Sequence, residues 1–234
     1  MSILGEAFRY LNDPLNWTGP RGILDLLKEH LAISGTAVLA AAAVALPVAV
    51  VLGHTGRGGG FTVALSNVSR AVPTLALLTV FAVTPIGFGN KATALALALF
   101  AIPPILTNTY VGFREVDRDV LESARAMGLA PTQVVSRVEL PLAVPAIMTG
   151  LRTAAVQVVA TATLAALVGG GGLGVIINLA FGQQDEGLLL AGAILVGLLA
   201  LLTEVLLVLL SRLVTPRGGQ VTQGRRRRVK VEPL

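Results

Sequence analysis

The stretch ESARAMGLAPTQVVSRVELP, residues 122–141, interrupts a chain that otherwise consists mostly of alanine, leucine, valine and glycine. Residues 114–141 around it hold four arginines and five acidic residues. Val120, Ala124 and Met127 recur at helical spacing, with Leu121 beside them, and charged residues fill the opposite face. This pattern predicts an amphipathic helix held outside the lipid between two apolar segments.

Local signals divide the charged stretch into a helix, a turn and a second helix. Asp117 is a suitable N-cap, and the acidic residues near it favour the positive end of a helix dipole. Gly128 is expected to stop the first helix in the left-handed conformation. Pro131 can start the second helix at its first position, and Pro141 is expected to end it and turn the chain back to the membrane.

The apolar stripe of this helix pair needs a surface to cover it. One interpretation is a helix lying on lipid headgroups, but that favours lysine and arginine on the polar face. Here the polar face is mixed and the loop is slightly acidic. The sequence therefore favours docking into a partner protein over lying on lipid.

The composition predicts an integral membrane protein. Of the 234 residues 54% are hydrophobic and 13% are charged, whereas soluble domains have about 25% charged residues. A spanning helix needs about 20 apolar residues, and five segments qualify: roughly 31–52, 61–83, 92–113, 144–168 and 188–213. We therefore predict an all-α fold with an interfacial segment over 1–30, a transmembrane domain over 31–213 and a basic tail over 214–234.

Basic residues in the short loops predict the orientation in the cell (inner) membrane. If the 114–141 loop is cytoplasmic, five spans place the N-terminus outside and the C-terminus inside. The inner side then holds twelve basic residues: Arg57, Arg114, Arg118, Arg125, Arg137, Arg212, Arg217, Arg225, Arg226, Arg227, Arg228 and Lys230. The outer side holds four: Arg9, Arg21, Lys28 and Lys91.

Several classes of site are not supported by the sequence. There is no cysteine, and the two histidines, His30 and His54, lie far apart without a cluster of other ligands, so no metal site is expected. The basic run at 225–228 is not accompanied by a soluble nucleic-acid module. We interpret it as a tail beside anionic lipid and expect no nucleic-acid partner.

The charged stretch resembles the "EAA" loop of binding-protein-dependent ABC importer permeases: E-A-A, three residues, G, nine residues, I-x-L-P. The matching positions are Glu122, Ser123, Ala124, Gly128, Val138, Leu140 and Pro141. Ser123 replaces the second-position alanine and Val138 replaces isoleucine. VPTLALL, IPPILTNTYVGF, GLRTAA and GGGGLG also stand in the order seen in osmoprotectant importers.

This resemblance implies a type I ABC permease that is not itself an enzyme. Its loop would dock on a cytoplasmic ATPase subunit, with a polar contact from Glu122, close packing by Ala124 and the interhelical angle set by Gly128. ATP and Mg²⁺ would bind that partner, and this chain would bind no cofactor. A second permease copy or a homologue would complete the pathway.

The solute implied is glycine betaine, choline or carnitine. Quaternary ammonium groups are usually recognised by aromatic cages, and the chain has only seven Phe, two Tyr and one Trp. We therefore expect high-affinity recognition on a separate extracytoplasmic solute-binding protein. Alternatives are a permease for another small solute, such as an amino acid of the methionine type, and an ion-coupled secondary transporter.

The glycine run GGGGLG, residues 169–174, fits G-x-G-x-x-G literally. It follows an apolar span rather than a strand and lacks the Gly-Lys-Ser/Thr ending of a phosphate-binding loop. We therefore interpret it as a tight outer turn after the fourth span.

Charges within spans cost about 2.5–3.5 kcal/mol on insertion scales, so each needs a role. Glu204 has two interpretations: an ion pair with Arg70 or Arg152, or a position on the pathway that attracts a cationic solute. Helix breaks and polar residues in the spans indicate the pathway. The candidates are Pro73, Thr74, Asn108, Thr109, Gln157, Thr161 and Thr163; the alternative for each hydroxyl is a bond back to its own helix.

Overall fold

The structure is a computed structural model, and it describes residues 2–215. Within that range every regular element is a helix. The tail expected at 214–234 lies outside the described residues except for Val214 and Thr215, and the side chain of Arg70 lies outside them as well.

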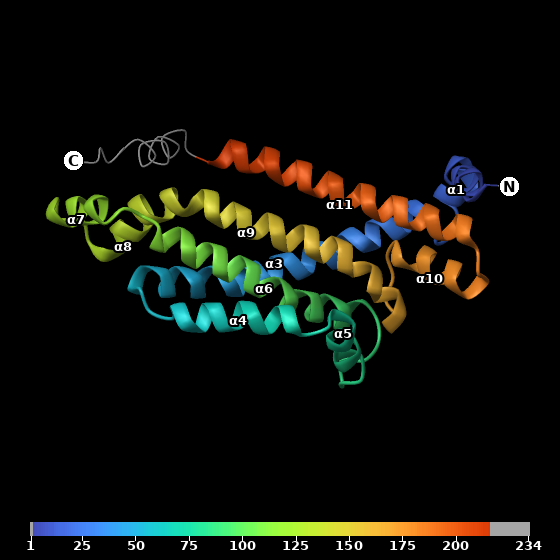
Figure 1. The fold of residues 1–234 in the computed structure, drawn as a ribbon, viewed down its shortest axis with the longest axis horizontal. Coiled ribbons are helices and arrows are strands. Elements are labelled where there is room, and N and C mark those ends of the chain that lie inside the picture. Colours follow the sequence, from blue (N-terminus) through green and yellow to red (C-terminus); the bar gives the residue numbers. More distant parts are fainter. Residues whose placement is uncertain (1, 216–234) are drawn as a thin grey trace, which may run out of the picture.

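Long apolar helices build the molecule (Figure 1). Within residues 2–215, four are long and apolar enough to cross a membrane, or five if one bent pair counts as a span. This result confirms the predicted all-α fold with about five spans. The bounds are α3 (Ile23–Thr55), α6 (Asn90–Arg114), α9 (Leu140–Thr161) continued by the 3₁₀ segment η2 (Ala162–Val168), and α11 (Glu186–Val214). The first helix begins eight residues before the expected span.

The expected second span is two helices rather than one. The helices α4 (Gly59–Ala71) and α5 (Thr74–Ala82) meet at a bend of 86°. Pro73 causes the break because it has no N–H to donate and forces the residue before it away from helical geometry. Val72 is accordingly extended, with φ −79° and ψ 120°.

Shorter helices occupy the two ends of the bundle. One end carries α7 (Arg118–Ala126), α8 (Pro131–Val134) and the π-helical segment η1 (Val135–Glu139); we call it the loop end. The opposite end carries α1 (Ile3–Asn12), α2 (Pro14–Thr18), α10 (Gly174–Gln183) and the glycine turn over 169–173; we call it the turn end (Figure 1). We did not predict α10, because its ten mostly apolar residues are too few for a span.

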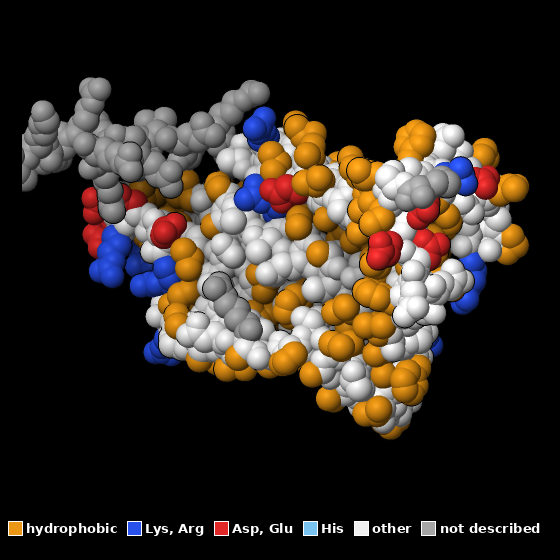
Figure 2. Space-filling model, turned by 45° about the vertical axis from the view of Figure 1, so that its right-hand side comes forward, with side chains coloured by type: hydrophobic (Ala, Val, Ile, Leu, Met, Phe, Trp, Pro, Cys, Tyr) orange, Lys and Arg blue, Asp and Glu red, His pale blue; other side chains and the backbone are white. Residues whose placement is uncertain are grey.

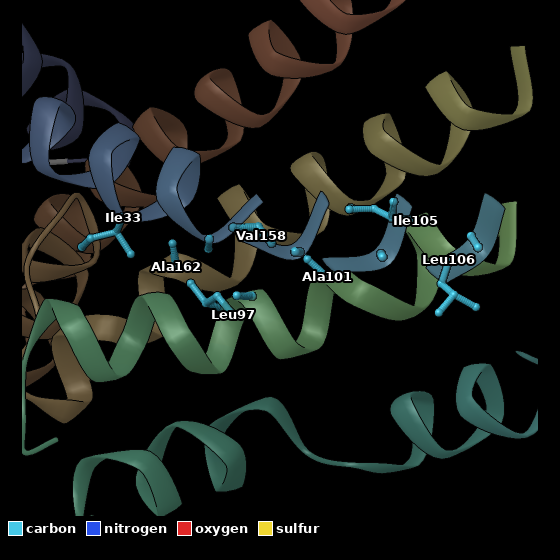
Figure 3. Close-up of a cluster of buried hydrophobic side chains, with 13 residues drawn as sticks. Ile33, Leu97, Ala101, Ile105, Leu106, Val158 and Ala162 are labelled. Atoms are coloured by element: carbon cyan, nitrogen blue, oxygen red, sulfur yellow. The ribbon is translucent and has the colours of Figure 1, made fainter. Parts of the chain in front are cut away.

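The central core lies between α3, α6 and α9. Ala37, Ala41, Ala45 and Ala49 form a fully buried row along α3, and small side chains allow spanning helices to approach closely. Leu97 and Ile105 from α6 and Val158 from α9 fill the space beside this row (Figure 3). This packing fixes the three helices on which the functional residues stand.

The α8, η1 and α9 elements form one continuous helical segment, which contradicts the expectation that Pro141 ends a helix. Pro141 stands at the start of α9, directly after the π turn of η1. A proline ring inside an α-helix clashes with the carbonyl four residues back. The π turn widens the helix at that point, and the Leu140 N–H donates to the Val135 carbonyl, five residues back. The helix therefore passes Pro141 without a break.

Apolar side chains cover much of the middle of the bundle, whereas charged side chains gather mostly towards its ends (Figure 2). The exposed leucines and valines of α11 include Leu198, Leu202, Leu206 and Leu213. This distribution is the one expected for a protein whose middle lies in hydrocarbon.

Candidate functional site

The charged loop begins and turns as its sequence predicts. The Asp117 side chain accepts a hydrogen bond of 2.9 Å from the Asp119 N–H and caps α7. Gly128 has φ +83°. The Gly128 N–H donates to the Arg125 carbonyl and the Leu129 N–H to the Ala124 carbonyl, which is the Schellman arrangement. Only a residue that adopts positive φ cheaply permits this reversal, so Gly128 sets the angle between α7 and α8.

The second helix of the loop starts at Pro131, as expected. The side-chain oxygen of Gln133 accepts a 2.9 Å hydrogen bond from the Ala130 N–H. This bond satisfies one of the backbone donors that a helix start leaves without a partner. The loop is therefore an ordered helix pair rather than an irregular connection.

The matched motif residues differ in exposure: Ala124 is buried, Val138 and Pro141 are half-buried, and the other four are exposed. Glu122 and Ser123 are exposed, and the Ser123 hydroxyl bonds back to the Asp119 carbonyl at 2.7 Å. Met127 is 74% exposed beside them. Ala124, in contrast, is buried within this chain. The expectation that Ala124 packs on a partner is wrong for this arrangement; it supports the loop from inside.

The segment η1 (Val135–Glu139), which we call the root of the loop, contains a polar contact that our sequence analysis missed. Glu139 stands between the motif residues Val138 and Leu140, and its side chain is only 3% exposed. Its Oε2 lies 2.6 Å from Nδ1 of His54, in the last turn of α3. We treated His54 as an isolated histidine because it lies far from His30 in the sequence and no cluster of other ligands accompanies it. The available signal in the sequence was an acidic residue between the two apolar motif residues, because such an acid needs a partner if it is buried.

A second polar network at the turn end was also missed. Asn90 donates through Nδ2 to Glu29, and the other Glu29 oxygen accepts from the Gly172 N–H at 3.1 Å. Asn90 Oδ1 accepts from the Gly171 N–H at 2.8 Å.

His30 is fully buried beside this network. Its Nδ1 accepts from the Leu173 N–H, and its Nε2 lies 2.9 Å from the Val159 carbonyl. Side chains of α3 and α6 thus hold the glycine turn by its backbone.

The pathway candidates differ in burial and in the partners of their polar groups. The Asn108 amide and the Thr161 and Thr163 hydroxyls bond back to their own helical segments, and Thr109 is fully buried. Pro73 is exposed and Thr74 half-buried at the break between α4 and α5. Among these candidates, Gln157 alone presents an exposed amide from a long span.

Gln157 belongs to a polar face of α9 that the sequence spacing could have revealed. Thr149, Thr153 and Gln157 follow one another at four-residue intervals, and all three are exposed. Residues four apart lie on the same side of a helix. We did not select Thr149 and Thr153 because we judged each polar residue singly instead of by its period.

An ion pair lies beside this polar face. Arg152 Nε and Glu204 Oε1 are 3.4 Å apart and join α9 to α11, with side-chain exposures of 37% and 40%. Arg152 is one of the two partners expected for Glu204. The pair is partly exposed within the spans, where isolated charges are unfavourable. The α9 face therefore carries both charge and hydrogen-bonding groups.

Comparison with known proteins gives a consistent picture. Residues 37–217 match the family model described as binding-protein-dependent transport system inner membrane component. A choline transport system permease protein of Bacillus subtilis (strain 168) is 38% identical over 192 residues, 82% of this chain and 88% of that protein. A carnitine transport permease protein of Listeria monocytogenes is 39% identical over 190 residues, 81% of this chain and 87% of that protein.

Solved structures show the same fold. A structure of the MetNI methionine ABC transporter, in inward-facing conformations, superposes with a TM-score of 0.71 at 24% identity. The match covers 88% of this chain and all of that chain. At this identity the likeness concerns the fold.

Proposed function

The chain belongs to the family of binding-protein-dependent transport system inner membrane components, and we propose that it is the permease subunit of an ATP-driven importer for small trimethylammonium osmoprotectants. One observation carries the proposal: relatives named for choline, carnitine and glycine betaine transport align with more than four fifths of the chain at 36–39% identity. The named solutes share a quaternary ammonium group.

The loop end supports docking on a cytoplasmic ATPase subunit. Glu122 and Met127 are exposed at the ordered helix α7, whose Ala124 is buried against the chain, so the helix presents a polar and an apolar contact in a fixed orientation. ATP and Mg²⁺ bind the ATPase in this proposal, and closure of its subunits shifts the permease between two conformations.

The α9 polar face supports a pathway shared with a second permease subunit. Gln157, Thr153 and the Arg152–Glu204 pair are poorly suited to lipid, since polar groups inside a membrane usually face a cavity or another helix. One chain supplies about five spans, which we take as half of a pathway. In this proposal the turn end faces an extracytoplasmic solute-binding protein, and the loop end and C-terminus are cytoplasmic.

The function is tested by reconstituting the full chain with its ATPase subunit and solute-binding protein in proteoliposomes. We expect ATP-dependent uptake of radiolabelled choline, glycine betaine or carnitine. Uptake of methionine without any of these three solutes contradicts the proposed substrate class. Uptake that follows an ion gradient and does not require ATP contradicts the proposed mechanism.

The docking surface is tested separately with the double variant Glu122→Arg/Gly128→Leu. The first change reverses the exposed charge, and the second disfavours the positive-φ turn. We expect loss of co-purification with the ATPase while the permease still folds. Lys28→Gln, at the opposite end of the bundle, is the control. A double variant that retains both complex and uptake refutes docking through this loop.

A further inference from the structure

The Glu139–His54 contact joins two parts of the chain that the continuous helix does not connect. A movement of α8 passes directly into α9, because α8, η1 and α9 form one helical segment. The first span, α3, has no covalent connection to that segment nearby. At the root of the loop, α3 and this helical segment are joined by the 2.6 Å contact from Glu139 Oε2 to His54 Nδ1.

The surroundings of the pair favour a rigid contact. Phe113, Ala143 and Ile147 form a buried cluster at the loop end, with Val50 and Val135 packed against it. Gly53, next to His54, lies so close to Phe113 that an added Cβ would stand 2.6 Å from the phenylalanine Cβ. A charge-assisted hydrogen bond is strong and directional where water is scarce. These close surroundings leave little room for the two side chains to rotate away from each other.

The same helix reaches the glycine turn at its other end. Glu29 and His30 stand 24 to 25 residues before His54 on α3, which is about 36 Å along a helix. They hold the backbone of Gly172 and Leu173. We therefore expect a displacement of α3 at the loop end to displace the glycine turn at the far end as well.

We propose that Glu139 and His54 are positioning residues that transmit movement of the ATPase-docking loop into the first span and through it to the outer glycine turn. This inference rests on the proposed function. The pair touches neither solute nor nucleotide; it acts through α3.

The test separates transmission from stability. Either single leucine variant, Glu139→Leu or His54→Leu, leaves one polar partner behind in a closely packed site. The double variant His54→Leu/Glu139→Leu removes both, and replacing both partners of a hydrogen bond by apolar groups can be nearly neutral or stabilising. Glu139→Gln keeps an acceptor oxygen for His54. Thr55→Val/Ser136→Ala changes exposed neighbours on the same two elements and is the matched control.

The measurement is solute uptake per ATP hydrolysed in proteoliposomes with the ATPase and the binding protein. We expect the double leucine variant to fold and to hydrolyse ATP, but its uptake per ATP should fall about fivefold or more, the lower range of allosteric coupling. Glu139→Gln and the control should stay near the unaltered chain. A double leucine variant with unaltered uptake per ATP overturns the inference. Failure of the unaltered chain to take up any of the three solutes would instead count against the proposed function.

A second measurement follows the far end directly. The chain contains no cysteine, so Phe88→Cys creates a single labelling site next to Gly169. We expect ATP to change the rate at which a membrane-impermeant maleimide labels residue 88, and the double leucine variant to remove that change. An ATP-dependent rate that persists in the double variant contradicts transmission through the pair.

Discussion

The two ends of α3 are both held by polar contacts, but the contacts differ in kind. At the loop end one side chain meets another: His54 and Glu139 stand on helical elements and form one charge-assisted contact. At the turn end, Glu29 and His30 accept hydrogen bonds from backbone N–H groups of a glycine-rich segment, and the Asn90 side chain also donates to Glu29. The loop end therefore depends on two particular side chains, whereas the turn end depends equally on the absence of side chains in the turn.

This difference predicts different responses to substitution. A side-chain pair can be replaced as a pair, because removing both polar groups leaves no buried charge behind. A backbone N–H is removed only by proline, so at the turn end each lost acceptor leaves an unsatisfied N–H. The four predictions below test this contrast, from the largest expected effect to the smallest.

The largest effect is expected at the loop end, from His54→Leu. This change leaves the almost fully buried Glu139 without its partner, which costs about 3–5 kcal/mol of stability. Glu139→Leu should cost less, because the remaining His54 side chain is 25% exposed and reaches water. Thermal unfolding of the detergent-solubilised permease measures both. Equal losses from the two variants would contradict the asymmetry.

At the turn end, Gly174→Ala should destabilise the permease by about 3 kcal/mol, the upper range for overpacking. An added Cβ at this position overlaps the Thr163 carbonyl, which is backbone and cannot rotate away. Gly182→Ala, in the same helix, is the control because a Cβ there meets nothing within 4 Å. It should be neutral or stabilising by up to about 1 kcal/mol. Similar unfolding temperatures for the two variants would show that close backbone approach is unimportant.

His30→Leu tests the cost of losing a backbone partner. The Leu173 N–H loses its acceptor in a fully buried position, and a buried unsatisfied donor costs about 1–3 kcal/mol. Amide hydrogen exchange should accelerate at Leu173 more than at the core residue Val158. Unchanged protection at Leu173 would argue against His30 as the group that holds the turn.

The smallest effect is expected between the two ends, at the Arg152–Glu204 pair. If its partly exposed side chains face a water-lined pathway, Glu204→Gln should change stability by less than about 1 kcal/mol, as for exposed ion pairs. Leu207→Ala on the same helix is a comparison for simple loss of apolar surface. If Glu204→Gln instead lowers the free energy of unfolding by about 2.5–3.5 kcal/mol, the cost of a charge left in lipid, the pair does not face water.

Much of the loop could be predicted because its signals are local. Asp117, Gly128 and Pro131 act on backbone groups within a few residues of themselves, and the structure confirms the roles expected for all three. The prediction that Pro141 ends a helix was wrong. The π turn that accommodates Pro141 depends on backbone hydrogen bonds that cannot be predicted from the sequence pattern. The second span was predicted as one segment with Pro73 as a helix break inside it, and the structure places a bend of 86° between α4 and α5 at that point.

The burial of individual side chains was the least predictable part. Ala124 and Met127 lie on one apolar stripe in sequence, yet one is buried and the other is 74% exposed. Periodicity identifies a stripe, but it does not tell which part of the stripe the chain covers itself. Thr109 and Gln157 show the same limit. Both are polar residues within spans, but Thr109 is buried and Gln157 is exposed.

The sequence by itself determined the all-helical membrane fold, the helix pair of the charged loop and the resemblance to ABC importer permeases. These conclusions follow from hydropathy, periodicity and short-range backbone chemistry, all of which are local. Only the tertiary structure decided that His54 meets Glu139, that Glu29 and His30 hold the glycine turn, and that Arg152 meets Glu204. Such contacts join residues 52 to 143 positions apart, and their partners depend on how the helices pack, which no local pattern specifies.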